Sequence, residues 1–386
     1  MNILSISGIL PVPGIVKAND FLIPLFETYR RKYPDDNIYF IKPFAYKPTL
    51  KSSRSLFRLK KYSLHGFNVV LLPYLSTWKR ASLHSIISSL SSYFLNRRTI
   101  RRLLKEWDID IVHAEYIFPD GYLARMIGKH FGIKYIVTVH DENRYMDYLI
   151  SRTRAIKILS NASWITPLNY PSARLYKKYV NTKIEVIPHG IDTRFLDIYP
   201  EYSARPEIRI ITIAQLLAYK NIDKVLIALT QVKNDYKIKY TIIGRGPERE
   251  KLENLVMQHG LQDIVIFKEQ ISYDQVPVEI CKNDIFILPS YFETFGRVLF
   301  EAMAVGLPVI CAKDSGIHGY FSEGVEALSV LHDNTNDIAE KLTLLLKDVR
   351  VRKEMGNKAK ELMRKHTWEN IVADLHEIYL ESIKNT

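Results

Sequence analysis

Short apolar runs alternate with amphipathic segments along almost the whole chain, and this alternation is what most restricts the fold. The runs NILSIS, DIVHAE and KYIVTV in the first half, and IRIITIA, DIFILP and PVICA in the second, are rich in Val, Ile and Leu. Apolar strands separated by helices are typical of a parallel sheet that helices cover on both faces. The sequence therefore predicts an α/β fold built from Rossmann-like, doubly wound parallel sheets.

The chain is long enough for two such domains. Its 386 residues exceed what one hydrophobic core usually supports. Residues 190–206 are polar, aromatic and proline-bearing, and strand periodicity resumes at Ile208. We predict a first domain at 1–190, a hinge linker at 190–206 and a second domain at 206–369. Ligands bind beyond the carboxyl ends of the strands in open α/β sheets, so functional residues are expected in the loops that leave the strands.

Positive charge is concentrated in the first domain. The net charge of +12 divides into +16 through Gly190 and -4 afterwards, and residues 42–105 hold 14 Lys or Arg and no acid. This asymmetry indicates an anionic partner, either a membrane surface or an anionic acceptor, or else a solvated basic face. Trp78, Tyr93 and Phe94 stand beside these cations. These aromatic side chains are either suited to dock on an anionic membrane or pack in the core of the first domain. The basic segment has no base-reading pattern, so we expect no nucleic acid partner.

The cysteines and the hydropathy of the chain indicate the cellular compartment in which the protein works. Cys281 and Cys311 lie in apolar runs, where Cys usually packs as a small hydrophobe, so we expect a reducing compartment. The apolar start has no basic segment before it and contains two prolines, which favours a first strand over a signal peptide. No apolar run reaches the roughly 18 residues that span a bilayer. We expect a cytoplasmic protein, with a peripheral position on the inner face of the cytoplasmic membrane as a further option.

Two carboxylates, Glu293 and Glu301, interrupt the apolar stretch FILPSYFETFGRVLFEAMAVGLPVI. A strand, a loop that ends at Gly296 and a helix closed by Gly306 explain its pattern. The helix start offers unpaired amides to a phosphate, whereas the acids are suited to accept hydrogen bonds from neutral hydroxyls. A phosphate flanked by two polyols is a nucleotide-sugar, which we expect as the ligand.

Several motifs together resemble one family. The run ETFGRVLFE, with seven residues between its two glutamates, is similar to the EX7E region of the retaining GT-B glycosyltransferases of family four. PVPG, TVHD, VIPHGID, IIGRGPER and LPS agree with that family in order and spacing. The resemblance covers most of the second half and, more thinly, the first. It implies a GT-B fold with two Rossmann-like domains facing a central cleft, and a final helix at 370–386 that crosses back to the first domain.

The resemblance also implies roles on the donor side. Glu301 would bind the ribose of the nucleotide, and Glu293 would contact the donor sugar at its reacting face. Lys220 would neutralise the diphosphate. Backbone atoms at Phe295, Gly296 and Arg297 would lie against sugar and phosphate, since a glycine allows close approach.

This chain departs from the family beside Lys220. Relatives carry an arginine five residues before the lysine, whereas this chain has Gln215, which can donate a hydrogen bond without charge. Lys220 alone still brings a charge to the diphosphate, and Arg245 and Arg297 are the candidates to compensate for the missing one. Gly244, within IIGRGPER, is also expected at the donor.

The first domain would complete the site. Gly14 matches a glycine whose backbone approaches the donor phosphates, although Ile15 stands where relatives have a second glycine. His140 matches the histidine that faces the donor sugar. Asp141 would orient that imidazole or bind acceptor, and His189 is assigned to the hinge. Residues of HAEYIFPDG that could meet the acceptor are His113, Glu115 and Asp120.

The implied reaction is transfer of a hexose, with retention, from a nucleoside diphosphate sugar to a hydroxyl of a glycan or lipid-linked glycan, as in polysaccharide biosynthesis. Catalysis would depend on Glu293, His140 and Lys220, with no metal and no cofactor besides the donor. A uridine or guanosine diphosphate donor is favoured. The alternatives are a non-hydrolysing sugar-nucleotide epimerase of GT-B fold and a non-catalytic protein that binds nucleotide-sugars or anionic surfaces.

Overall fold

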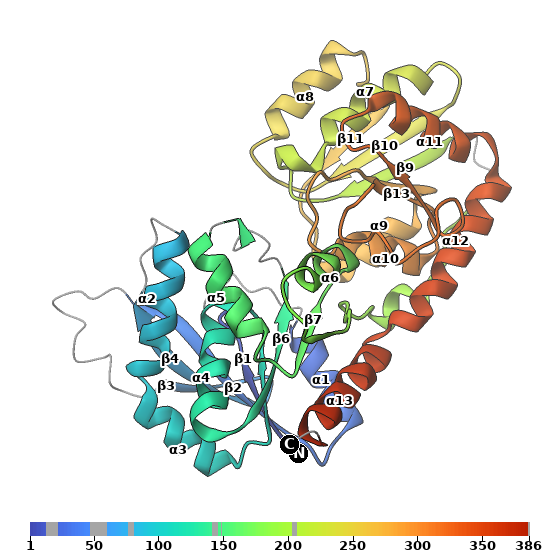
Figure 1. The fold of residues 1–386 in the computed structure, drawn as a ribbon. Helices are drawn as coiled ribbons and strands as arrows, with labels where there is room; N and C mark the ends of the chain where they lie inside the picture. Colours follow the sequence, from blue (N-terminus) through green and yellow to red (C-terminus); the bar gives the residue numbers. More distant parts are fainter. Residues whose placement is uncertain are drawn as a thin grey trace. The chain divides into compact units, whose positions relative to one another are not determined.

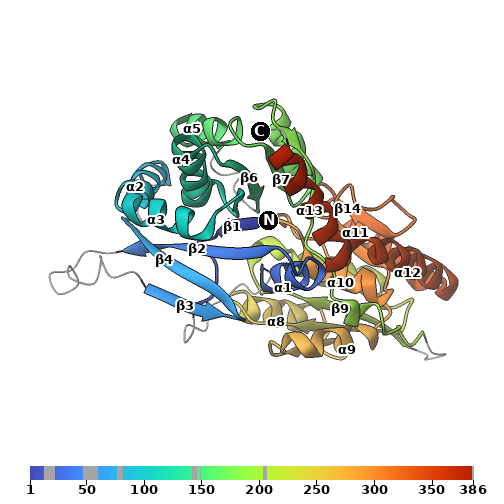
Figure 2. The same cartoon turned by 90° about the horizontal axis from the view of Figure 1, so that it is seen from below.

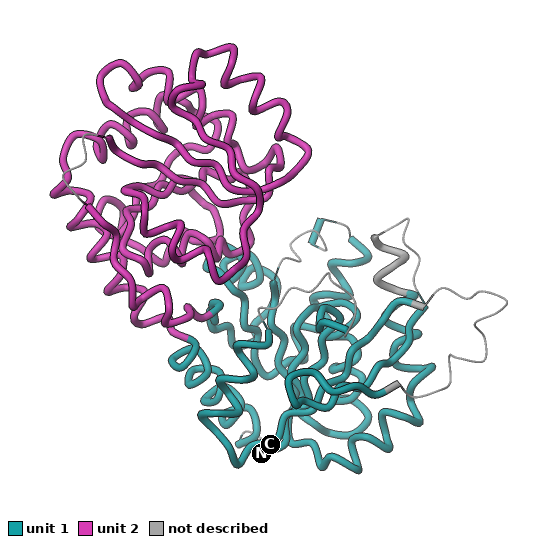
Figure 3. The backbone as a smooth tube through the Cα atoms, turned by 180° about the vertical axis from the view of Figure 1, so that it is seen from behind, with its two compact units in different colours: residues 1–189, 368–386 teal, residues 190–367 magenta. Residues whose placement is uncertain are grey.

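The computed structural model describes residues 1–12, 22–46, 60–75, 81–140, 146–147, 149–202 and 207–384. The chain forms two compact units, and each contains its own parallel sheet (Figure 3). The first unit comprises residues 1–189 and 368–386, and the second comprises residues 190–367.

The first unit contains an eight-stranded sheet in the order β3-β4-β2-β1-β5-β6-β7-β8. Every neighbouring pair is parallel except β3 and β4, which form an antiparallel hairpin at one edge. The strands are β1 (Asn2–Ile6), β2 (Asn37–Tyr46), β3 (Lys60–Leu64), β4 (Phe67–Leu75), β5 (Ile111–Ala114), β6 (Lys134–Val139), β7 (Trp164–Pro167) and β8 (Lys183–Ile184).

Helices cover both faces of this sheet (Figures 1 and 2). Successive residues of β1 point to opposite faces of the sheet, and both faces are apolar. Leu4 and Ile6 pack into one core, and Ile3 packs into another. The first core is covered by α2 (Ala81–Phe94), α3 (Arg97–Trp107), α4 (Tyr122–Phe131) and α5 (Leu149–Leu159). The second is covered by α1 (Leu22–Lys32) and by the last helix of the chain, α13 (Trp368–Lys384). Helix α6 (Tyr170–Lys177) follows β7.

The second unit contains a six-stranded sheet whose paired strands are all parallel, in the order β11-β10-β9-β12-β13-β14. The chain builds outward from β9 through β10 to β11, then returns to the other side of β9 with β12. This reversal is a topological switch point, where open α/β sheets bind ligands. The strands are β9 (Ile208–Ile213), β10 (Ile238–Ile243), β11 (Val265–Lys268), β12 (Ile285–Leu288), β13 (Val309–Ala312) and β14 (Ala327–Val330).

Helices of the second unit begin and end at recognisable signals. The Asn334 side chain caps α11 by accepting the amides of Asn336 and Asp337, each at 3.1 Å. Gly306 ends α10 in the left-handed conformation, with φ of 101°. The helices are α7 (Ile222–Val232), α8 (Arg249–Gln258), α9 (Val276–Cys281), α10 (Arg297–Val305), α11 (Thr335–Lys347) and α12 (Val349–Met363).

The predicted fold class is confirmed, because both units are α/β domains built on parallel sheets. Strand β3 was not anticipated. Its hairpin turns at His65 and Gly66, whose φ angles of 50° and 80° suit a tight two-residue connection.

The described part of 190–206 packs within the second unit. The amide of Ile191 donates to the carbonyl of His366 at 2.7 Å, and the Tyr202 hydroxyl donates to the carbonyl of Gly306 at 2.7 Å. The role of this segment as a hinge stays a prediction.

Cys281 and Cys311 are both unpaired. Within the residues that the structure describes, no helix combines the length and apolar character needed to cross a bilayer.

Candidate functional site

The loop between β12 and α10 ends in a conformation that only glycine adopts readily. Gly296 has φ of 79°, and a Cβ at this position would lie 2.9 Å from Leu299 Cδ1 and 3.1 Å from Glu293 Cγ. Helix α10 starts at the next residue, so the amides at its amino end point back toward this loop. These amides and the positive end of the helix dipole make this turn suited to an anion.

Lys220 and Glu293 form an ion pair at the switch point of the second sheet. Lys220 ends a short 3₁₀ helix (Ala218–Lys220) after β9, and Glu293 follows the adjacent strand β12. Lys220 Nζ lies 2.5 Å from Glu293 Oε2, and the two side chains are only 11% and 17% exposed. Two residues that the sequence assigned to one site, 73 positions apart, are thus in contact.

Glu301 has a separate set of partners one turn into α10. Its carboxylate is nearly buried and lies 3.3 Å from Arg297 Nη2. Burial raises the pKa of Glu301, although Arg297 and Tyr273 oppose the shift. Burial acts to lower the pKa of Arg297, but the Glu301 charge and Tyr273 raise it overall. Arg297 is therefore engaged with Glu301.

A pocket of about 300 Å³ opens at the ends of β9, β10 and β11. Three predicted residues, Gln215, Gly244 and Arg245, line it. Gly244 has φ of 147°, and a Cβ there would lie 1.9 Å from the carbonyl oxygen of Ala214. The other lining residues are Ile213, Ala214, Ile243, Gln270, Ile271, Tyr273 and Val276.

Phe295 points its ring into the second unit's interior. The side chain is buried and stacks on Phe300 with ring centroids 4.3 Å apart. The Phe295 side chain therefore belongs to the core, and its backbone contact with the donor stays a prediction.

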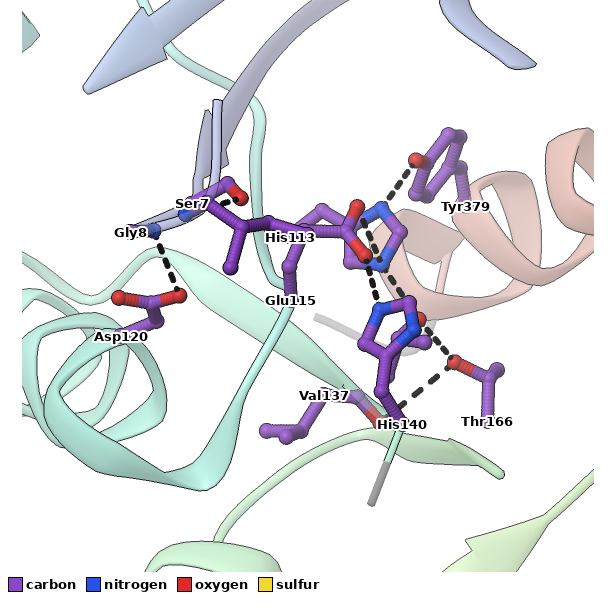
Figure 4. Close-up of polar contacts among 11 residues, drawn as sticks. Ser7, Gly8, His113, Glu115, Asp120, Val137, His140, Thr166 and Tyr379 are labelled. Atoms are coloured by element: carbon purple, nitrogen blue, oxygen red, sulfur yellow. Dashed lines mark hydrogen bonds and ion pairs between the residues drawn. The ribbon is translucent and has the colours of Figure 1, made fainter. Parts of the chain in front are cut away.

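In the first unit, His140 lies in a buried polar cluster at the carboxyl edge of the sheet (Figure 4). His140 Nε2 lies 2.9 Å from Glu115 Oε2, and its ring stacks on Tyr116. His113 Nδ1 lies 2.7 Å from the Tyr379 hydroxyl of α13, and its Nε2 lies 2.7 Å from Thr138 Oγ1.

The electrostatics of this cluster favour an ionised Glu115 beside a neutral His113. Burial acts to raise the pKa of Glu115, but His113 and His140 lower it overall. Burial lowers the pKa of His113. His113 and Glu115 are each only 1% exposed, which argues against the predicted contact of either with an acceptor.

Asp120 is also fully buried, and it holds the backbone that follows β1. Asp120 Oδ2 accepts the amide of Gly8 at 3.1 Å, while Lys42 Nζ donates to the carbonyl of Gly8 (Figure 4 shows Asp120 and Gly8). Burial raises the pKa of Asp120 to about 8, against the lowering effect of the Gly8 amide. Asp120 thus fixes the entry to the β1–α1 loop rather than facing an acceptor.

Asp120 should make the stability of the chain depend on pH. The ordinary pKa of the carboxyl is 3.8, so between pH 4 and 8 the native chain holds a proton that the unfolded chain has lost. The free energy of unfolding therefore falls as pH rises through this range, by up to about 1.4 kcal/mol for each pH unit. We expect Asp120→Asn to remove this slope, measured by urea unfolding at pH 5 to 8. The exposed Asp235→Asn is the control, and an unchanged slope in Asp120→Asn would contradict the expectation.

The sequence also predicted Gly14, Asp141 and His189. Gly14 and Asp141 lie outside the described residues. His189 is the last residue of the first unit before the chain enters the second, and its ring lies 5.7 Å from that of His140.

Tyr273 and Tyr379 were not predicted from the sequence. Tyr273 follows β11 at the edge where ligands were expected, so its position in a strand-end loop was an available signal. Tyr379 belongs to a helix 266 residues from its partner His113, and no local pattern predicts that contact.

Two family models match consecutive parts of the chain. The model described as Glycosyltransferase Family 4 matches residues 64–195, and the one described as Glycosyl transferases group 1 matches residues 200–362. The chain belongs to the family-four glycosyltransferases of GT-B fold. The family membership expected from the sequence is thereby confirmed.

Individual relatives of this glycosyltransferase are distant. An uncharacterized glycosyltransferase, MJ1178 of Methanocaldococcus jannaschii, is 26% identical over 75% of this chain and 81% of its own length. The N-acetyl-alpha-D-glucosaminyl L-malate synthase of Bacillus anthracis is 26% identical over 72% of this chain and 76% of its own. The crystal structure of Anabaena Alr3699/HepE in complex with UDP has a TM-score of 0.74 at 16% identity, with 99% of this chain and 100% of that chain covered. That likeness supports the GT-B fold.

Proposed function

We propose that this glycosyltransferase moves a hexose from a uridine or guanosine diphosphate sugar to an acceptor hydroxyl with retention of configuration. The observation that carries the proposal is the contact of Lys220 with Glu293 at the switch point of the second sheet, beside the amino end of α10. A cation and free helix amides suit a diphosphate, and an acid next to them suits a sugar hydroxyl. The Bacillus anthracis relative is by its name an N-acetyl-alpha-D-glucosaminyl L-malate synthase, which supports transfer of a hexose-derived sugar. The Anabaena structure is a complex with UDP, which supports a uridine nucleotide.

In this proposal the chain stabilises the leaving group. As the bond to the anomeric carbon breaks, negative charge grows on the diphosphate, and Lys220 together with the amides at the start of α10 is positioned to stabilise it. When Lys220 binds the diphosphate, Glu293 becomes available to the donor sugar. The action of His140 at the donor sugar stays a prediction; within the first unit its Nε2 lies 2.9 Å from Glu115 Oε2. The phosphate contact expected of the Gly14 backbone also stays a prediction, because Gly14 lies outside the described residues.

The nucleoside would occupy the 300 Å³ pocket at the ends of β9 to β11. Glu301 beside it would bind the ribose. Gln215 would donate a neutral hydrogen bond where relatives have a charge, and Arg245 at the same pocket is the nearer candidate to compensate, because Arg297 is paired with Glu301.

The test is a thermal-shift screen of the full chain against UDP, GDP and ADP sugars, followed by turnover assays with EDTA present. A single nucleotide class should stabilise the chain, and transfer should continue without a metal. NMR of the product should show the anomeric configuration of the donor. An inverted product, or loss of turnover in EDTA that Mg²⁺ restores, would contradict the proposed mechanism.

The two alternatives give different results in the same assay. An epimerase would convert the donor with no acceptor present. A binding protein would be stabilised by the nucleotide-sugar but would give neither transfer nor donor hydrolysis.

For the acceptor side, we propose docking on an anionic membrane to reach a lipid-linked acceptor. Arg97, Arg98, Arg101 and Arg102 are all exposed on α3, directly after the exposed apolar side chains of Phe94 and Leu95, which are 59% and 49% exposed. Such a combination favours an anionic bilayer. Tyr93, in contrast, is a core residue, and Trp78 lies outside the described residues.

We expect Arg97→Glu with Arg98→Glu to weaken binding to vesicles containing anionic phospholipid by at least tenfold, since each basic residue near the surface contributes about 1 kcal/mol. Cosedimentation measures this affinity. Lys353→Glu with Lys358→Glu, on exposed positions of α12, makes the same change of charge and should have little effect. Equal losses in both double variants would argue against docking through α3.

A further inference from the structure

Glu115 is a buried acid to which the proposed reaction assigns no part. It follows β5 and is 1% exposed, and its Oε2 lies 2.9 Å from Nε2 of His140, which follows the neighbouring strand β6 (Figure 4). The His140 ring also stacks on Tyr116, with ring centroids 4.8 Å apart. The imidazole is thus held by a carboxylate at its edge and by an aromatic ring on its face.

The contact with Glu115 determines which nitrogen of His140 carries the proton. An ionised carboxylate has no proton and can only accept a hydrogen bond. Burial acts to raise the pKa of Glu115, but the two histidines beside it lower the pKa overall, so the carboxylate is ionised at neutral pH. At 2.9 Å from this carboxylate, Nε2 of His140 has to donate, and Nδ1 of the neutral ring is then the acceptor.

A directed chain of hydrogen bonds fixes the second histidine of the cluster. Thr166 Oγ1 donates to the carbonyl of Val137 at 3.5 Å, so it accepts from Thr138 Oγ1 at 2.6 Å. Thr138 in turn accepts from Nε2 of His113 at 2.7 Å, and Nδ1 of His113 accepts from the Tyr379 hydroxyl at 2.7 Å. Each hydroxyl uses its single proton once. Helix α13, to which Tyr379 belongs, therefore anchors the end of the chain.

The N–H edge of His113 also faces Glu115. Its Nε2 lies 3.6 Å from Glu115 Oε1, whereas His140 contacts the other oxygen. The carboxylate thus has an N–H edge on each side, which restricts rotation of the Glu115 side chain. Because burial lowers the pKa of His113, that ring stays neutral and the negative charge stays on Glu115. A carboxylate fixed in this way can orient the His140 ring.

We propose that Glu115 is a positioning residue that holds His140 in the tautomer with its proton on Nε2, so that Nδ1 accepts a hydrogen bond from a hydroxyl of the donor sugar. The contact with the sugar rests on the proposed function, whereas the tautomer is a property of the chain alone. A ring whose acceptor is already fixed need not be reoriented when the sugar binds.

Nitrogen NMR of the full chain labelled with ¹⁵N-histidine measures the tautomer, because an N–H nitrogen and an unprotonated imidazole nitrogen resonate far apart. His140→Asn identifies the His140 signals among those of the 11 histidines. In the wild type we expect an N–H signal for Nε2 and an unprotonated signal for Nδ1. In Glu115→Leu, which removes the acceptor, both signals should move toward intermediate values as the tautomers interchange. Glu115→Gln keeps one acceptor oxygen, so its signals should lie closer to those of the wild type.

Kinetics of the same variants and a control separate positioning from general damage. We expect kcat/KM for sugar transfer to fall by about tenfold to a hundredfold in Glu115→Leu, which is the usual effect of removing a partner that orients a metal-bound histidine. Glu115→Gln should recover part of this loss. Tyr135→Phe is the control, because it removes from β6 a buried hydroxyl that donates to the carbonyl of Ile158 at 2.6 Å. This variant should keep both the His140 signals and kcat/KM of the wild type.

Each result decides between the claims. A proton on Nδ1 of His140 in the wild type, or His140 signals that Glu115→Leu leaves unchanged, would overturn the tautomer. If Glu115→Leu does not fold, unchanged signals in Glu115→Gln have the same meaning. If the signals change as expected but kcat/KM does not, the role of Glu115 in sugar transfer is overturned. If the wild type has the expected tautomer but transfers no sugar, the tautomer stands and the proposed function fails.

Discussion

Replacing Lys220 with alanine is expected to lower kcat/KM for sugar transfer by about a hundredfold to a thousandfold, the usual effect of removing one group that stabilises transition-state charge. Lys220 is mostly buried and lies directly on Glu293, so its charge acts in a site with little water to screen it. The alanine variant also leaves Glu293 without its cation, which should disturb the contact of this acid with the sugar. Steady-state kinetics with varied donor measure the effect.

Lys224→Ala is the matched control for this loss of charge. Lys224 lies on α7, in the same unit, and pairs with its neighbour Asp223. This variant should keep activity within about twofold of the wild type. A Lys220→Ala chain that folds normally and retains more than a third of the wild-type activity would exclude Lys220 from catalysis.

A second large effect is expected from Gly244→Ala. The new Cβ would lie 1.9 Å from the backbone oxygen of Ala214, and φ of 147° is rare for any residue with a side chain. Backbone strain and overpacking together should lower the free energy of unfolding by about 3 to 6 kcal/mol. The β9 and β10 ends would have to separate, so nucleotide affinity should fall as well. Urea unfolding and calorimetry measure the two effects.

Gly260→Ala, in the same unit, separates the cost of backbone strain from the cost of overpacking. Gly260 also has positive φ, of 60°, but the nearest atom to a new Cβ is the flexible end of Lys233 at 3.6 Å. The cost should be about 1 to 2 kcal/mol, from the left-handed conformation alone. If Gly244→Ala destabilises no more than Gly260→Ala, the close approach at Ala214 is less restrictive than its geometry indicates.

Strands that are buried on both faces were predictable from sequence, and the edge of the first sheet was not. The runs around Ile285 and Val309 are continuous and apolar because helices cover both sides of them. Strand β3 reads KKYSL, and its polar side chains give no such signal at an edge. The pair His65–Gly66 was the available clue to its hairpin.

The candidate site was predictable as a set of residues but not as a set of contacts. Strand-end position and motif spacing identified Glu293, Glu301 and Lys220. Which acid pairs with which cation depends on side-chain direction at the switch point, and sequence spacing does not contain that information. The same limit hid Tyr273, whose ring lies beside the Arg297 guanidinium and so joins a loop after β11 to a helix after β12.

The first unit is assembled from both ends of the chain, which affects how it folds during synthesis. Helix α13 buries Trp368, Ile371, Leu375 and Tyr379 in the core that also contains α1 and Ile111. Until this helix emerges from the ribosome, only α1 covers this face, and the ribosome-bound chain exposes the part of it that α13 will bury; burial of each large side chain would add about 1.5 to 3 kcal/mol. Domains normally complete in the order of translation. In this protein the second unit can finish before the first, and a chain released before residue 368 would carry an exposed apolar surface suited to recognition by chaperones.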